Sequence, residues 1–168
     1  MRHNTHMTMF IPPTLFNCVT GTWTQAAGQV AGTIAKHVAA ADETTVVNIP
    51  VAIPSNSVDL QGSKVYSVEI DYEILVAACD AVTATINKVA RGADGAVAVV
   101  SAVTFTYDTG HDTAGERLDV DQHKMTLTLD TPEWLDNDEY LLVCLTCDKA
   151  ATTTMDFLGA FVNYTARD

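Results

Sequence analysis

Side chains that could carry chemistry gather in one polar stretch, residues 108–123. Carboxylates clustered on a loop can hold Ca²⁺ through oxygen ligands, and a histidine beside an acid can act as a general base. The stretch lacks the glycine and the bidentate glutamate of an EF-hand loop, and no GxSxG, HExxH or P-loop motif accompanies its histidines. We interpret it as a solvated loop and leave open whether it binds a metal. Its acidic and histidine members are Asp108, His111, Asp112, Glu116, Asp119, Asp121 and His123.

A second acidic group consists of Glu69, Asp71 and Glu73, which alternate along one segment. Alternate residues of a strand share a face and lie about 7 Å apart, which is close to the carboxylate separation of inverting glycosidases. Three acids on a wet face are more often simply solvated, and we favour that interpretation. Trp23 and Trp134 could stack on sugars or anchor a core, and we expect at least one of them in the core.

The four cysteines include the pair Cys144 and Cys147, which has the spacing of a metal or redox motif. The surrounding residues indicate a strand, where positions three apart point to opposite faces. No second pair completes a zinc site. We therefore expect buried, reduced cysteines, as in a protein assembled in a reducing cytoplasm, and we predict no cofactor and no catalytic residue.

Alternation of apolar and polar residues with period two predicts the elements that position these groups. In residues 66–76, Tyr66, Val68, Ile70, Tyr72 and Ile74 point one way and the acids point the other. His37 is placed in a strand as an ordinary surface or edge residue, and Gly159 indicates a bulge or a close backbone approach. Segments 139–147 and 153–165 are apolar on both faces, as central or subunit-facing strands would be. The expected strands are 21–24, 32–38, 44–53, 66–76, 82–89, 96–107, 123–131, 139–147 and 153–165.

About eight or nine strands without βαβ alternation predict an all-β fold, either a sandwich or a barrel. We favour an antiparallel two-sheet sandwich resembling a jelly roll, which long crossing connections suit. The 168 residues suit a single domain. We assign residues 14–168 to the sandwich and residues 1–13 to an extended N-terminal arm, in which Met7 or Met9 could equally be the start. The arm has no apolar core of a signal peptide. Phe10, Ile11, Pro12 and Pro13 are expected to contact a neighbouring subunit.

The amino-acid composition indicates which classes of binding partner the protein could have. Charged residues make up only 18% of the chain and hydrophobic residues 48%, against roughly 25% charged in an average domain. Either surface is buried in an oligomer or the core is rich in alanine and valine, and we favour the oligomer. The net charge of −12, with no cluster of Lys or Arg, argues against nucleic acid. No apolar run approaches the length of a membrane span.

Several segments resemble those of a class of phage structural protein, the small β-sandwich virion proteins that include capsid decoration (cement) proteins. The resemblance implies a non-enzymatic role on the capsid surface of a bacteriophage virion, assembled in the host cytoplasm. It also implies symmetric self-association, often as a homotrimer, and contact with the major capsid protein. The segments that carry it are 65–73, 86–94, 120–129, 134–140 and 156–165.

Two alternatives remain. The first is a tail-associated receptor-binding or carbohydrate-binding β-sandwich module, which an exposed Trp23 or Trp134 beside acids would favour. The second, less favoured, is a hydrolase using the carboxylates. The sequence does not decide between the capsid and the tail as the location of the protein. It also does not give the symmetry of the oligomer or the order of the strands.

Overall fold

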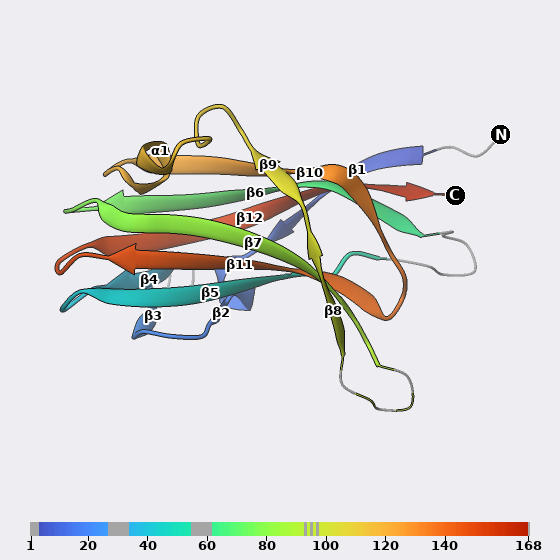
Figure 1. The fold of residues 1–168 in the computed structure, drawn as a ribbon, viewed down its shortest axis with the longest axis horizontal. Coiled ribbons are helices and arrows are strands. Elements are labelled where there is room, and N and C mark those ends of the chain that lie inside the picture. The colour runs from blue at the N-terminus through green and yellow to red at the C-terminus, as the bar shows by residue number, and fades with distance from the viewer. Residues whose placement is uncertain are drawn as a thin grey trace.

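The computed structural model describes residues 4–26, 34–54, 62–92, 94, 96 and 98–167, which form two antiparallel sheets (Figure 1). The strands of the seven-stranded sheet, sheet A, are β1 (Asn4–Ile11), β3 (Trp23–Ala26), β4 (Ile34–Val38), β6 (Ser63–Leu75), β9 (Phe105–Tyr107), β10 (Gln122–Leu135) and β12 (Thr154–Arg167). The five-stranded sheet, sheet B, contains β2 (Asn17–Cys18), β5 (Glu43–Val51), β7 (Cys79–Ala90), β8 (Val99–Val103) and β11 (Glu139–Lys149). Two short helices, η1 (Pro13–Leu15) and α1 (Ala114–Leu118), lie between strands.

The strand order confirms the predicted jelly roll. The order β4-β12-β6-β10 in sheet A faces β5-β11-β7-β8 in sheet B. From β4 to β7 the chain changes sheet at every connection, and it does so again from β10 to β12. These connections form two interlocked Greek keys. One predicted strand is divided: segment 96–107 gives β8 in sheet B and β9 in sheet A, so it is not the single hairpin partner that its composition suggested.

The core lies between the sheets, as the alternation predicted. Val68, Ile70, Tyr72 and Ile74 of β6 are fully buried there. Tyr66 is not on this face, because β6 carries an extra residue: Asn163 of β12 pairs with Ser67 and the next residue pairs with Val65. A bulge of this kind turns the extra side chain to the other face, and Tyr66 is half-buried there.

The segment expected to be an arm is a strand of the sheet. All of its residues from Asn4 to Ile11 pair along the C-terminal half of β12, from Asn4 opposite Arg167 to Ile11 opposite Ala160. Strand pairing and the buried end of the strand hold this segment to its own chain: Ile11 is 3% exposed and Met9 is half-buried, whereas residues 5–8 are exposed. The N-terminal and C-terminal ends therefore lie on the same side of the molecule (Figure 1). No helix in the described residues is long and apolar enough to cross a membrane.

Candidate functional site

The side of sheet A that faces away from sheet B, called here the outer face, carries a row of aromatic rings. Strand register brings them together from distant segments: Phe10 of β1 pairs with Phe161 of β12, and their rings lie 4.9 Å apart. Phe10 is 49% exposed and Trp134, at the end of β10, is 41% exposed. Lys64 lies 5.4 Å from the centre of the Trp134 ring. We name this part of the face the aromatic half, and its members are His6, Phe10, Tyr66, Trp134 and Phe161.

Hydroxyl and amide groups lie between these rings. Thr8 donates a hydrogen bond of 2.8 Å to Asn163, which donates one of 3.1 Å to Ser67. These three side chains belong to β1, β12 and β6, so they form a line across the sheet. Each can exchange its internal bond for one to a ligand, because hydroxyls and amides both donate and accept.

Gly159 provides the place where the Phe10 ring lies. A Cβ on Gly159 would come within 2.4 Å of the Phe10 ring, and the backbone has a φ of +146° that favours glycine. The register of β12 against β6 shifts between Phe157 and Gly159. The bulge or close approach predicted at this glycine is therefore confirmed, and what approaches it is an aromatic ring of β1.

The other part of the outer face, the acidic half, is formed by Glu69, Asp71 and Glu73 of β6 and Asp156 of β12. The three predicted carboxylates do share one face, and strand pairing adds Asp156 opposite Glu73. Sequence reasoning missed Asp156, because only the register of two strands distant in the chain places it there. Lys124 pairs with Glu69 at 3.1 Å, and Lys36 lies 3.8 Å from Asp156.

Two of these carboxylates are poorly compensated. Asp156 is 6% exposed, and neither its Oδ1 nor that of Asp71 has a hydrogen-bond partner among the described residues. Burial raises the pKa of both carboxyls above the ordinary aspartate value. The nearest acids, Glu69 for Asp71 and Glu73 for Asp156, raise the two pKa values further, whereas Lys124 and Lys36 oppose them. Each anion therefore lacks part of the positive charge and hydrogen bonding that would stabilise it.

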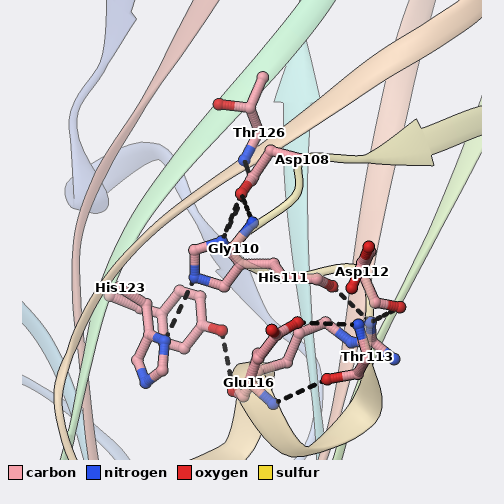
Figure 2. A network of polar contacts seen from close by, with 10 residues as sticks. Asp108, Gly110, His111, Asp112, Thr113, Glu116, His123 and Thr126 are labelled. Atoms are coloured by element: carbon pink, nitrogen blue, oxygen red, sulfur yellow. Dashed lines mark hydrogen bonds and ion pairs between the residues drawn. The ribbon is translucent and has the colours of Figure 1, made fainter.

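The loop 108–123 is more ordered than the predicted solvated loop (Figure 2). Asp108 contacts Nδ1 of His111 at 2.9 Å, and Nε2 of His111 lies 3.3 Å from Nδ1 of His123. His123 stacks on Tyr72 with ring centres 4.6 Å apart. Both histidines are less than a tenth exposed. The loop packs against the buried Tyr72, which stacks on His123 and donates its hydroxyl to the carbonyl oxygen of Arg117.

Backbone groups hold the loop together. Arg117 of α1 is buried and donates to the carbonyl oxygens of Val82 and His111. Thr113 and Glu116 form a capping box at the start of α1. Burial opposes ionisation of Asp108, but hydrogen bonds from the Thr126 amide, His111 and the Gly110 amide hold its pKa below the ordinary value.

Asp108, His111 and His123 follow one another in the order of a proton relay, but this chain of contacts does not end at a reactive group. Nε2 of His123 lies 2.9 Å from the backbone carbonyl of Asp119, which is neither a nucleophile nor a leaving group. In the described residues no group of three histidine, cysteine or acidic side chains is arranged to hold a metal ion. These contacts therefore stabilise the conformation of the loop.

A second polar contact joins the two sheets internally. Lys149 of β11 is fully buried, and its Nζ lies 2.6 Å from Nδ1 of His37 on β4. Nε2 of His37 is 3.2 Å from Glu43, at ion-pair distance but outside hydrogen-bond geometry. The Trp23 ring lies 5.0 Å from the Lys149 ammonium. His37 is therefore an interior residue, and its prediction as a surface or edge residue was wrong. Its strand lies between β3 and β12 in the sheet, and its side chain points inward, against Lys149 and the turn at Gly21.

The cysteines and tryptophans singled out in the sequence lie in different environments. Cys147 is buried and Cys144 half-buried on opposite faces of β11, and the cysteines, all within the described residues, are free. Burial raises the pKa of Cys147 to about 12, so this thiol is unreactive. Trp23 packs against the core while Trp134 is exposed, as expected for at least one of the pair.

The four predicted contact residues do not share one environment. Ile11 and Pro13 are buried in their own chain, Pro12 is half-buried, and Phe10 is exposed. Contact of these residues with a neighbouring subunit stays a prediction, for which Phe10 offers the most accessible surface.

Comparison with known proteins finds only loose structural similarity among the matches reported below. No family model and no curated protein matches the chain. A structure of TmCBM61 in complex with β-1,4-galactotriose superposes with a TM-score of 0.41 and 10% identity, over 94% of this chain and 86% of that one. A structure concerned with the promiscuous specificity of carbohydrate-binding modules of the β-sandwich superfamily gives 0.40 and 14%, over 93% and 55%. Likeness this loose says nothing about what the present chain binds.

Proposed function

We propose that this protein is a non-catalytic carbohydrate-binding module and that the outer face of sheet A is its binding surface. The observation that carries this proposal is the aromatic half, in which exposed rings alternate with hydroxyl and amide groups on a continuous sheet. One of the features expected to favour a binding module is present, an exposed tryptophan, Trp134, while the carboxylates of the outer face lie in its other half.

The chemistry of a sugar explains why such a surface fits. A pyranose presents apolar C–H groups on its faces and hydroxyls at its rim, so it packs on an aromatic ring and hydrogen-bonds at its edge. Phe10 and Trp134 offer the rings. Asn163, Thr8 and Ser67 offer the edge contacts from the next rows of the sheet.

The polar clusters of the interior support binding without catalysis. The Asp108–His111–His123 chain ends on a backbone carbonyl, and Lys149 is enclosed in the core with 0% exposure. A catalytic group needs a reactive atom that a substrate can reach. Neither cluster provides one.

The test is a glycan array followed by titration of the strongest ligand. Phe10→Ala and Trp134→Ala should each weaken binding about tenfold or more, since a buried aromatic contact contributes at least 1.4 kcal/mol. Tyr140→Ala is the matched control, because Tyr140 is a half-buried aromatic of sheet B. Absence of any glycan ligand, or equal affinities in all three variants, would overturn the proposal.

A second candidate is a decoration protein on a phage capsid, and the observation that favours it is the edge strand β8. Val99 and Val100 are 64% and 61% exposed, and β8 is the strand at one edge of sheet B. Edge strands without charged side chains readily pair with another chain. A homotrimer on the capsid surface, in contact with the major capsid protein, would cover this strand.

Binding to purified capsids tests this second role. Phe10→Ser is a better probe than deletion of residues 1–13, because deletion would remove the strand β1 from its own sheet. Loss of capsid binding by a Phe10→Ser protein that keeps its fold would support the role. Sedimentation of capsids without the wild-type protein would exclude it.

A further inference from the structure

We infer that the outer face of sheet A binds the interior of an extended, uncharged polysaccharide chain, which lies across the strands and is contacted over about four sugar residues or more. This inference rests on the proposed function, because it assigns the substrate class and the chain direction to the same face. The feature that carries it is a row of hydroxyl and amide side chains that crosses the sheet, called here the polar row. Its members are Thr8, Asn163, Ser67, Thr128 and Thr106.

Strand register aligns the polar row. Thr8 of β1 pairs with Asn163 of β12, which pairs in turn with Ser67 of β6. Ser67 also pairs with Thr128 of β10, and Thr128 pairs with Thr106 of β9. Neighbouring strands lie about 4.8 Å apart, so the row extends about 19 Å from β1 to β9. It therefore runs across the strands and uses one residue of each.

The side chains of the polar row are accessible to a ligand. Thr8, Thr106 and Thr128 are exposed, and Asn163 and Ser67 are half-buried. The hydroxyl of Thr128 has no hydrogen-bond partner in the part of the chain that the structure describes. At the β9 end of the row, the hydroxyl of Thr106 donates a hydrogen bond of 2.8 Å to a carboxylate oxygen of Asp130. The row thus offers free or exchangeable hydrogen-bonding groups along its length.

The charge of the polar row indicates the class of ligand. All of its members are uncharged, in a chain whose net charge is −12. A polymer with an acidic group on each residue would be repelled by the chain as a whole and would find no cation within the row. A neutral sugar polymer fits better, because its hydroxyls both donate and accept hydrogen bonds, as the side chains of the row do.

The spacing of the row indicates the shape of the ligand. A pyranose with equatorial bonds at both linkages advances by roughly one strand spacing per residue in an extended chain, so each residue can contact the next strand. An α-1,4-linked glucose chain coils and would leave the row after a few residues. Larger side chains flank the row and offer faces for stacking: Phe10 and Phe161 lie on one side of it, and Tyr66 lies on the other.

Calorimetric titration with oligosaccharides of increasing length tests the inference. The probes are β-1,4-linked oligomers of glucose, mannose and xylose, from disaccharide to hexasaccharide. Maltohexaose is the matched control, because it contains glucose in α-1,4 linkage. In the series that binds most tightly, affinity should increase at least about tenfold from the disaccharide to the pentasaccharide and less than about twofold beyond it. Maltohexaose should bind at least about tenfold more weakly than the hexasaccharide of that series.

Two substitutions locate the chain on the sheet. A chain that begins over β1 reaches β10 with about its fourth residue and β9 with about its fifth. Thr128→Val should therefore weaken pentasaccharide binding about three- to tenfold, as expected for one lost hydrogen bond, and leave disaccharide binding unchanged. Thr106→Val should weaken binding of the pentasaccharide but not of the trisaccharide. Thr85→Val is the control, because Thr85 is an exposed threonine of sheet B.

Three results would overturn the inference: equal affinities for disaccharide and hexasaccharide, equal binding of maltohexaose, or equal effects of Thr128→Val and Thr85→Val. A ligand found only among branched or terminal glycans would also overturn it. If that binding still requires Phe10 and Trp134, the proposed function stands. If no glycan binds, either on the array or in titration, both the inference and the proposed function fail.

Discussion

The contact between His37 and Lys149 can be tested quantitatively. In His37→Leu, the buried ammonium of Lys149 loses a partner 2.6 Å away while its exposure stays at 0%. Removing one member of a buried polar pair costs about 3–5 kcal/mol. For a domain of this size, 1 kcal/mol shifts the melting temperature by about 2–4 °C, so we expect a fall of roughly 6–20 °C. The Trp23 ring, 5.0 Å from the ammonium, should keep the fall toward the lower end.

The second substitution separates this interaction from general packing. In His37→Leu/Lys149→Met both polar groups are gone, and an apolar pair of similar volume should restore most of the lost stability. Urea unfolding of the wild type, both single variants and the double variant gives the coupling free energy, which we expect to exceed 1.5 kcal/mol, within the range of contacting pairs. If the two single losses simply add in the double variant, the proposed contact does not stabilise the fold.

The same variants predict a pH dependence. Burial lowers the pKa of His37, the charge of Lys149 lowers it further, and Glu43 opposes them. The unfolded chain therefore takes up a proton near pH 6.5 while the folded protein does not. The free energy of unfolding should then decrease as pH falls below 6.5. His37→Leu should lack this part of the decrease, and parallel curves for both proteins between pH 7.5 and 5 would refute the reasoning.

Three further substitutions have defined outcomes. Asp108→Asn removes the anion that accepts a hydrogen bond from His111 and should lower the free energy of unfolding by about 1.5–3 kcal/mol at pH 7. The difference between variant and wild type should shrink on acidification. The folded-state pKa of Asp108 lies below its ordinary value, so the stability that its carboxylate contributes is lost as pH falls through that pKa. Gly159→Ala should displace the Phe10 ring and weaken glycan binding, and it should also lower the free energy of unfolding because an alanine is strained at a φ of +146°. Equal binding by Gly159→Ala and wild type in titration would contradict this. Val100→Lys should reduce self-association in light scattering with stability unchanged, because lysine on an edge strand discourages strand pairing; an unaltered mass distribution would remove β8 from consideration as an interface.

The parts of the structure that follow from the sequence are those that depend on local alternation. A period of two places Glu69, Asp71 and Glu73 on one face whatever strands lie beside them. The same rule separates Cys144 from Cys147. The count of strands and the absence of crossover helices indicate a sandwich or a barrel, of which the jelly roll is one.

The parts that do not follow depend on pairing between distant segments. Asp156 joins the acidic half only because β12 pairs with β6. Tyr66 faces outward because of one extra residue in β6, and a shift of one residue moves a side chain to the opposite face. Lys149 was unexpected in the core because lysine is seldom fully buried. Its burial depends on His37, which a strand from the other sheet provides.

The pairing of β1 with β12 has a mechanical consequence. Asn4 lies opposite Arg167, and the strands run antiparallel from there. A force that separates the two ends of the chain would load the hydrogen bonds between these strands one after another, as in opening a zip, instead of loading them together in shear. The molecule should thus yield at low tension when it is pulled by its ends, even if the sandwich is thermally stable. If the protein bears mechanical force in an assembly, that force would have to act on the broad faces of the sheets and not on the ends of the chain.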